Sequence, residues 1–425
     1  MPSGTISMAL YGATIGKLGL LTFPSATNQA CANVVPNDQL VETPYLFYFL
    51  LSERKNFIEL GQGGAQPNIS QEIVRNHPFQ LAPLAEQRRI ADRLEKLLAE
   101  IEQCKERMAK IPVLLKRFRQ SVLAAACSGR LTTDWREDQN PAPDIDLILE
   151  TIFQRRISAA KSARERQLLI EQFQQVEEED SDTLPVQWKY IYLNKLCASF
   201  DYGTSSKSLP AGNVPVLRMG NIQGGKIDWN DLVYTSDVAE IQKYSLHGKT
   251  VLFNRTNSPE LVGKTAIYRD ERPAVFAGYL IRINHLPELD PEYLNLCLNT
   301  NYAREFCQRV KADGVSQSNI NAQKLGRFEI PFCSLEEQQE IVERAGKLLA
   351  LADRIEERYQ GAKKQVDNLT PSILAKAFRG ELVPTEAELA AREGRDYESA
   401  AQLLQRIDPS ATKRSPRGAL RRAKL

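Results

Sequence analysis

The sequence predicts an α+β protein in which two related mixed-sheet domains are separated by two long helices of coiled-coil type. Three observations predict it: the chain repeats itself, each copy holds a long heptad pattern, and strand-like runs precede that pattern. The repeat has a constant offset of 251 residues, since Leu-x-Glu-Gln at Leu84 returns at Leu335 and Gly-x-Leu at Gly129 returns at Gly380. A period this long indicates a duplicated domain with two similar sites, not a solenoid.

Short β-rich runs bounded by Gly, Asn, Asp and Pro predict the strands of the second copy. These runs are 214–219, 250–253, 264–268 and 279–283, and a helix is expected at 291–309. The first copy keeps matching residues, because Gly16 and Lys17 correspond to Gly263 and Lys264. This alignment places Met1 opposite Gly248, so we expect a first domain that lacks its N-terminal part.

Both long helices carry apolar residues in alternating steps of four and three. Such a seam predicts two helices that pack along their lengths, with two independent amphipathic helices as the alternative. Pro112 and Pro371 fall inside the pattern and predict a kink or an interruption in each helix. The seam residues expected to pack are Ile90, Leu94, Leu97, Ile101, Met108, Leu115, Ile341, Leu348, Ile355, Tyr359, Val366 and Ile373.

These patterns divide the chain into seven segments. We expect a first β-rich domain (1–83), a long helix (84–130), a helical and acidic linker (131–183), a second, complete β-rich domain (184–334), a second long helix (335–382), a short helical segment (383–410) and a basic, disordered tail (411–425).

The composition, 42% apolar and 25% charged, is that of a globular protein. No apolar window is long enough to span a membrane and no basic region opens a signal peptide, so we expect a cytoplasmic protein. The seven cysteines are scattered without a Cys-x-x-Cys pair, which favours reduced thiols over disulfides or metal sites. The second β-rich domain holds 17 Lys and Arg against 14 Asp and Glu, an excess that suits a nucleic-acid-binding face or an ordinary solvated surface.

No catalytic motif is complete in the sequence. Gly263–Lys264–Thr265 lacks the first glycine of a phosphate-binding loop, since position 258 is serine. Asn257–Ser258–Pro259–Glu260 lacks the aromatic residue with which amino-methyltransferases stack a flipped base. Glu53–Arg54–Lys55 is favoured as a solvated helix over a nuclease site, and the three histidines do not recur between copies. We therefore expect no catalytic or metal-binding residues here, and a binding subunit whose chemistry resides elsewhere.

Several motifs together carry a resemblance to a known family. Polar loops at 64–70 and 314–321 run into Pro-Leu-x-Glu-Gln or Ser-Leu-Glu-Glu-Gln and then into a long helix that closes in Gly-x-Leu. Residues 12–17 read Gly-Ala-Thr-Ile-Gly-Lys, similar to a segment of that family. From Thr5 to about Leu404 the chain resembles the specificity (S) subunit of type I restriction–modification systems.

The resemblance implies a non-catalytic DNA-recognition protein. Each β-rich domain would be a target recognition domain that reads half of a bipartite site in double-stranded DNA, and the two long helices would pack antiparallel and set the spacing. Two methyltransferase (M) subunits would dock on the helices and restriction (R) subunits would join them. S-adenosylmethionine, ATP and Mg²⁺ would belong to those partners, with no cofactor in this chain.

Base-reading residues are predicted from chemistry, because amides read adenine and guanidinium groups read guanine in the major groove. Lysines at the Gly-Lys turns are better placed for phosphate contacts. The alternative for each polar residue is a role in a turn or a helix cap. The candidates are Lys17, Gln66, Asn68, Arg218, Asn221, Arg255, Asn257, Lys264, Gln317, Asn319 and Asn321.

The sequence also allows other classes of function. A coiled-coil scaffold would bind proteins and no DNA, a fused nuclease or methyltransferase would need a motif not found here, and a truncated specificity subunit would be inactive. If the first domain is incomplete, we expect poor binding to a bipartite target. The base sequence of the target does not follow from the residues, because DNA shape contributes to it.

Overall fold

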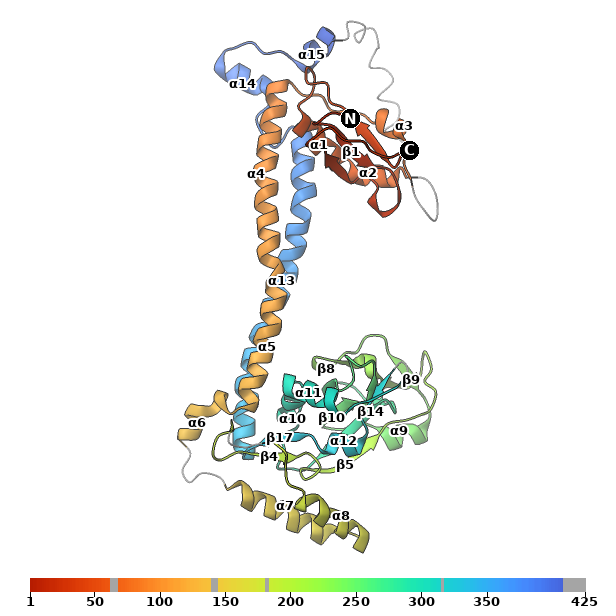
Figure 1. Cartoon of the computed structure of the whole chain (residues 1–425), viewed down its shortest axis with the longest axis vertical. Helices are drawn as coiled ribbons and strands as arrows, with labels where there is room; N and C mark the ends of the chain where they lie inside the picture. Colours follow the sequence, from red (N-terminus) through yellow and green to blue (C-terminus); the bar gives the residue numbers. More distant parts are fainter. Residues whose placement is uncertain (62–67, 139–143, 180–182, 315–316, 408–425) are drawn as a thin grey trace. The chain divides into compact units, whose positions relative to one another are not determined.

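The computed structural model describes residues 1–61, 68–138, 144–179, 183–314 and 317–407. The chain forms two compact units (Figure 1): unit 1 contains Met1–Ile111 with the described residues from 357 onward, and unit 2 is Pro112–Glu356. Gln66 and the predicted basic tail, 411–425, lie outside the described residues.

Unit 1 is built around strand β1, which lies between β2 and β3 and pairs antiparallel with both. Helix α1 packs on this small sheet, and its apolar side chains share a core with the first turns of α4 and the last turns of α13. The elements are β1 (Ile6–Ala9), β2 (Leu18–Leu20), β3 (Cys31–Val34), α1 (Thr43–Ser52), α2 (Arg54–Glu59), α3 (Gln71–Arg75), α4 (Leu84–Ala109), α14 (Glu386–Glu393) and α15 (Ala400–Ile407).

Unit 2 contains a mixed sheet of order β5-β14-β10-β12-β8-β7, in which β12 and β8 run parallel and the other neighbours are antiparallel. The sheet of unit 1 is antiparallel in its described strands, so the expected mixed character belongs to unit 2. The main sheet and its helices are β5 (Cys197–Tyr202), β7 (Ile222–Gln223), β8 (Gly225–Ile227), β10 (Lys249–Asn254), β12 (Thr265–Arg269), β14 (Leu280–His285), α9 (Val238–Tyr244), α10 (Pro291–Leu298), α11 (Asn301–Val310) and α12 (Ala322–Gly326).

Smaller elements of unit 2 flank that sheet. Strand β4 (Lys189–Tyr192) pairs with β17 (Glu329–Phe332), next to the start of α13. The remaining elements are β6 (Val214–Leu217), β9 (Val233–Thr235), β13 (Val275–Phe276), β11 (Thr256–Asn257), β15 (Ala312–Asp313), β16 (Ser318–Asn319), α5 (Ile111–Cys127), α6 (Thr133–Glu137), α7 (Ile145–Ala159) and α8 (Ala163–Gln174).

The two units repeat one hairpin bond for bond. Gly16 N donates to Ala9 O and Gly263 N donates to Asn254 O, both at 2.9 Å. Both glycines have positive φ, +70° and +91°, and a Cβ on Gly263 would lie 2.5 Å from a cysteine sulfur. A side chain would be strained and would clash at this turn. The Gly-Lys correspondence read from the sequence is therefore a correspondence of backbone geometry.

The long helices pair antiparallel in the described parts of each unit. In unit 1, Ile90 and Leu94 of α4 share the core with Leu374 of α13 (Leu335–Phe378). In unit 2, Arg119 of α5 binds Asp353 at 2.9 Å, whereas further along the chain Leu131 O accepts from Arg344. The first predicted helix is interrupted at Lys110, just before Pro112, whereas α13 passes through Pro371 without interruption.

All but one of the predicted seam residues are buried or half-buried. Ile355 is 41% exposed, so the expectation that it packs within the pair is wrong. At that level Ala352 is the buried residue, and Arg119 reaches across to Asp353 and Glu356, which leaves Ile355 outside the contact. Ile90, Leu94, Ile101, Leu115 and Ile341 are buried, and Leu97, Met108, Leu348, Tyr359, Val366 and Ile373 are half-buried.

A glutamine near the start of each long helix binds that helix to the β-rich part of the same unit. We call this contact the glutamine clamp. Gln87 and Gln338 are both fully buried, and each makes three hydrogen bonds with backbone groups. The amide nitrogens donate to Leu40 O and Ala82 O in unit 1 and to Glu288 O and Cys333 O in unit 2; the amide oxygens accept from Glu42 N and Asp290 N. The Glu-Gln motif therefore fixes how each helix leaves its domain.

The preceding glutamate connects the start of α13 in unit 2 to the segment that follows α5 and to Trp188, which precedes β4. The buried carboxylate of Glu337 accepts hydrogen bonds from Thr132, Arg136 and the indole of Trp188, at 2.7–2.9 Å. In unit 1, Glu86 accepts from the backbone of Glu386, beyond Gly380. Gly129 and Gly380 both adopt positive φ at the helix ends, which explains the repeated Gly-x-Leu motif.

Within the described part of the chain, no helix combines the length and the apolar character needed to cross a bilayer.

Candidate nucleic-acid interface

The predicted polar loops of unit 2 meet on a small ribbon beside the main sheet. Strand β11 follows β10 directly and pairs antiparallel with β16, which also pairs with β15. Ile320 N donates to Arg255 O at 2.9 Å, which ties the loop after β16 to the hairpin. Residues more than 60 positions apart in sequence thereby share one surface.

Arg255 is held in a fixed orientation at the centre of this ribbon. Its guanidinium lies 4.6 Å from the ring centroid of Tyr202, a distance typical of a cation–π contact. It donates to Asn319 Oδ1 at 3.3 Å and to Gly278 O at 3.4 Å. Its Nε is buried and makes no hydrogen bond among the described residues. These long bonds orient the guanidinium while leaving it able to donate elsewhere.

The candidate amides around Arg255 have distinct local roles. Asn319 Nδ2 donates to Thr256 Oγ1 at 2.8 Å, so this half-buried side chain bridges β11 and β16. Asn257 Oδ1 accepts from Ser258 N at 2.8 Å, which shapes the turn. Asn321 is exposed and caps α12, since its Oδ1 accepts from the backbone of the third helical residue. Gln317 is exposed beside β16.

A carboxylate balances the charge of this ribbon. Asp313 on β15 accepts from the hydroxyl of Ser318 and forms an ion pair with Lys311 at 3.2 Å. The Ser318 hydroxyl first and Lys311 second hold the pKa of Asp313 below its usual range. Asp313 is therefore ionised near neutral pH and neutralises Lys311 beside the amide-rich loop.

Arg218 and Asn221 are brought together with each other and not with Arg255. Asn221 is 3% exposed, and its amide donates to Asp228 O and Asn230 O and accepts from Arg218 N. The guanidinium of Arg218 donates to Asp231 O at 2.7 Å. These bonds build the turn at Met219–Asn221, the alternative role considered for both residues.

The lysine of each Gly-Lys turn lies beside its hairpin. Lys264 Nζ donates to Gln223 Oε1 at 2.9 Å, which links the hairpin to β7. In unit 1, Lys17 is exposed on the equivalent turn.

Unit 1 repeats the frame of this interface with different side chains. Ile69 N donates to Leu10 O, as Ile320 N donates to Arg255 O, and Tyr11 pairs with Asn68 as β11 pairs with β16. Asn68 therefore occupies the place of Asn319, while Leu10 occupies the place of Arg255. Asn68 is exposed.

Two tyrosines of the interface were missed in the sequence. Tyr202 is 42% exposed and accepts from Ala322 N through its hydroxyl, while Tyr279 is 48% exposed next to the carbonyl that Arg255 contacts. A signal was available, because aromatic residues beside basic ones are typical of nucleic-acid surfaces. It was obscured because Tyr202, Arg255 and Tyr279 lie in different segments of the chain and only the fold brings them together.

Comparison with protein families agrees with this arrangement. The model of the type I restriction modification DNA specificity domain matches residues 1–112 and 185–361, which is most of both units. The chain belongs to this family. The match covers the Gly-Lys hairpins, the polar loops and the beginnings of the long helices in both copies.

Two relatives and one solved structure are similar to most of this chain of the specificity family. The EcoKI specificity subunit of Escherichia coli strain K12 is 28% identical over 389 residues, covering 89% of this chain and 74% of the relative. The EcoDI specificity subunit of Escherichia coli is 29% identical, covering 87% and 76%. A chain from a structural study of the assembly of a type I restriction–modification system matches with a TM-score of 0.64 at 18% identity, covering 90% and 83%.

Proposed function

We propose that this chain is the DNA sequence-specificity subunit of a type I restriction–modification complex and that each unit reads one half of a bipartite target. The observation that supports this proposal most strongly is the repeated frame of a chain that belongs to this family. The hairpin, the asparagine at Asn68 or Asn319 and the glutamine clamp are present in both units. A protein with two similar heads suits a partner with two half-sites.

The base readers of unit 2 centre on Arg255. A guanidinium packed against the ring of Tyr202 can donate two parallel bonds to guanine, the commonest specific contact in the major groove. Asn257 on the ribbon, with Gln317 and Asn321 on either side of β16, supplies amides for adenine. Lys264 and Lys17 contribute phosphate contacts, which position the protein without reading sequence.

The chemistry resides in partner subunits under this proposal. Two methyltransferase subunits dock on the helices and bring S-adenosylmethionine, and restriction subunits join with ATP and Mg²⁺. Exposed apolar side chains on α5, Val113 at 53% and Leu114 at 59%, offer a surface for such docking. The proposal puts the complex in the cytoplasm, where its ligand is double-stranded DNA.

The decisive experiment uses the chain assembled with its methyltransferase subunits. Selection from a pool of random DNA duplexes is expected to enrich two defined sequence blocks separated by a fixed, unspecified gap. Binding should weaken steeply with salt, because phosphate contacts release counterions. Enrichment of no sequence, or DNA affinity independent of salt, would refute the proposal and favour a protein-binding scaffold.

Two substitutions separate base reading from phosphate binding. Arg255→Ala should cost about 1–3 kcal/mol on the selected site and relax the preference at one base pair. Lys264→Ala should weaken binding to all sequences and lower the salt slope by about 1. The matched control is Arg272→Ala, because Arg272 also lies 4.6 Å from an aromatic ring, that of Trp229, but outside the ribbon. Equal losses for Arg255→Ala and Arg272→Ala would exclude the assigned role of Arg255.

A further inference from the structure

Two cysteines of unit 2 lie against each other where α5 meets α10. Cys127 is the last residue of α5, and Cys297 lies on α10, 170 positions later in the chain. Their Sγ atoms are 3.2 Å apart, and the thiol of Cys127 donates to the sulfur of Cys297. All seven cysteines of the chain are free thiols. The pair therefore joins two distant segments through a contact between thiols and without a covalent bond.

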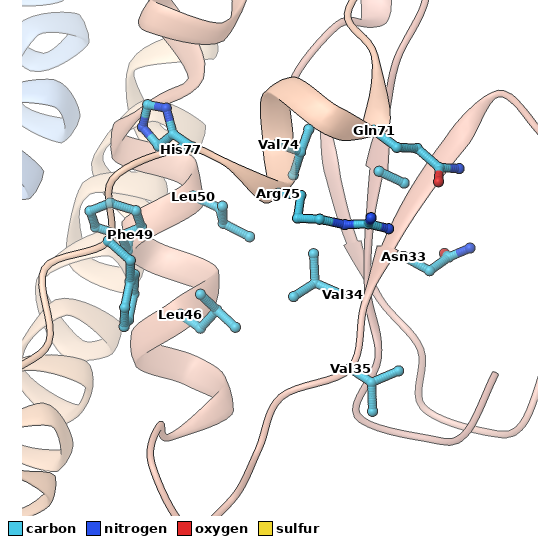
Figure 2. Close-up of a pocket in the computed structure, with 12 residues that line it drawn as sticks. Asn33, Val34, Val35, Leu46, Phe49, Leu50, Gln71, Val74, Arg75 and His77 are labelled. Atoms are coloured by element: carbon cyan, nitrogen blue, oxygen red, sulfur yellow. The ribbon is translucent and has the colours of Figure 1, made fainter. Parts of the chain in front are cut away.

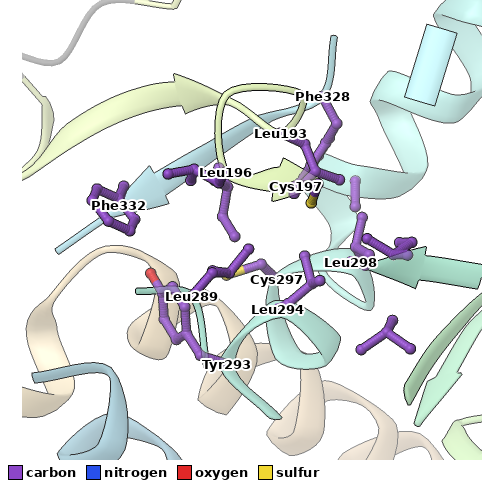
Figure 3. Close-up of a cluster of buried hydrophobic side chains, with 14 of the residues drawn as sticks. Leu193, Leu196, Cys197, Leu289, Tyr293, Leu294, Cys297, Leu298, Phe328 and Phe332 are labelled. Carbon is purple, nitrogen blue, oxygen red and sulfur yellow. The ribbon is translucent and has the colours of Figure 1, made fainter. Parts of the chain in front are cut away.

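The two thiols differ in burial. Cys297 is 1% exposed and projects from α10 into the buried apolar cluster of unit 2, with Leu294 and Leu298 of the same helix (Figure 3). Cys127 is half-buried at the edge of that cluster. Burial first, and then the hydrogen bond with Cys127, holds the pKa of Cys297 well above its usual range. Cys297 is therefore a neutral thiol near pH 7, and Cys127 is the sulfur that a reagent from the solvent reaches first.

A small cavity connects the pair with the solvent. Its volume is about 220 Å³, and both Cys127 and Cys297 line it. Ala124 and Asn301 line it as well, and both of these residues are exposed, so the cavity is open at the protein surface. A volume of this size holds several water molecules, and hydrogen peroxide is little larger than water. A small polar oxidant therefore has access to both sulfurs in the folded chain.

The internal repeat shows that the shared frame brings these two positions together. Cys127 corresponds to Phe378 at the offset of 251 residues. Cys297 corresponds to Phe49, since both lie four residues after the tyrosine whose hydroxyl donates to a carbonyl of the segment before the long helix. In unit 1 the ring of Phe49, seen in Figure 2, meets that of Phe378 with the centroids 5.4 Å apart. The same two positions are therefore in contact in both units, and only in unit 2 are both side chains thiols.

We propose that Cys127 and Cys297 form a site of oxidative modification, at which a peroxide converts the two thiols into a disulfide that links α5 to α10. Cys127 loses its proton and its sulfur attacks one oxygen of hydrogen peroxide; the O–O bond breaks, and a sulfenic acid and one water form. The sulfur of Cys297 then attacks the sulfur of Cys127. The S–O bond breaks, and the proton of Cys297 leaves with the hydroxyl group as a second water.

The second step requires only a small displacement. A disulfide has an S–S length of about 2.05 Å, so the two sulfurs have to approach each other by about 1 Å. Cys127 ends α5, where the last carbonyls of a helix lack helical partners and the backbone is less constrained than in the middle. The bond closes a loop that spans 170 positions, so it restricts the unfolded chain and stabilises unit 2. The site goes beyond the proposed DNA function, since the reaction involves no DNA.

Treatment of the reduced full chain with hydrogen peroxide, followed by blocking of the remaining thiols with N-ethylmaleimide, tests the proposal. Trypsin places Cys127 in 120–130, Cys297 in 283–304 and Cys333 in 328–344, each with a single cysteine. Mass spectrometry without reduction is expected to find 120–130 joined to 283–304, and dithiothreitol should separate them. Absence of this pair, a bond from Cys297 to Cys333, or recovery of the pair only from a covalent dimer on a non-reducing gel would overturn the proposal.

Single substitutions assign the effect of the bond to this pair. Peroxide should raise the melting temperature of the unmodified chain by about 5 °C or more, because the disulfide closes a long loop. Cys127→Ser should abolish this rise, and the substitution is mild because Cys127 is half-buried. Cys104→Ser is the matched control, since Cys104 is the exposed cysteine of α4, and the rise should be unchanged in it. Equal rises in the two variants would refute the assignment.

Discussion

Replacing Gln338 by leucine tests the glutamine clamp at the start of α13. Gln338 is fully buried and makes three hydrogen bonds, to Glu288 O at 3.0 Å, Cys333 O at 2.8 Å and Asp290 N at 2.8 Å. Leucine has a similar volume but leaves two carbonyls and one N–H buried without partners. At about 1 kcal/mol for each lost bond, the free energy of unfolding should fall by about 3 kcal/mol.

Urea denaturation followed by tryptophan fluorescence measures this loss, because Trp135, Trp188 and Trp229 all lie in unit 2. The midpoint should fall while the slope of free energy against urea stays the same. Gln339→Leu is the control, since Gln339 is the exposed neighbour on the same helix. Equal midpoints for Gln338→Leu and Gln339→Leu would refute the clamp.

Two further predictions concern titratable groups. Burial raises the pKa of Cys307 to about 12, so iodoacetamide at pH 8 should alkylate exposed Cys104 in the native chain and Cys307 only after unfolding, as measured by mass spectrometry; equal labelling would contradict this. Burial raises the pKa of Asp353, but the hydrogen bonds from Lys226 and Arg119 lower this pKa by a larger amount. The pKa of Asp353 is therefore below its usual value. Its contribution to stability is therefore present above about pH 4 and lost as the pH falls through the lowered value. The difference in urea midpoint between the native chain and Asp353→Asn should shrink below about pH 4, and a difference that grows there would exclude this linkage.

The sequence predicted those features that depend on local pattern and on repetition. The heptad seam located the paired helices because the side chains of an α-helix return to one face every three or four residues. The Gly-Lys turn was found because only glycine tolerates the positive φ and the close sulfur at Gly263. The Glu-Gln motif was noticed as a repeat, but its role as a clamp on backbone groups required the fold.

Features that depend on contacts between distant segments were not predictable. Asn221 has the chemistry of a base reader, yet it is buried because the carbonyls of Asp228 and Asn230 curl around its amide. Tyr202 supports Arg255 from a strand 53 positions earlier in the chain, and no periodicity signals such a meeting. Ile355 fits the heptad but is exposed, because the ion pairs of Arg119 take the contact at that level.

The two units place residues at equivalent backbone positions in their candidate interfaces, but some of these residues have different side chains. Asn68 and Asn319 occupy equivalent places, because each pairs with the segment that follows the first strand of the repeated hairpin, and the next residue in each case donates to the equivalent carbonyl. Leu10 occupies the place of Arg255, however, and its side chain is 3% exposed and belongs to the core of unit 1, whereas the half-buried arginine carries N–H donors. The guanine contact proposed for Arg255 in unit 2 therefore has no counterpart at this place in unit 1. Under the proposed function, the two halves of the selected target should differ in sequence even though one backbone frame presents both readers.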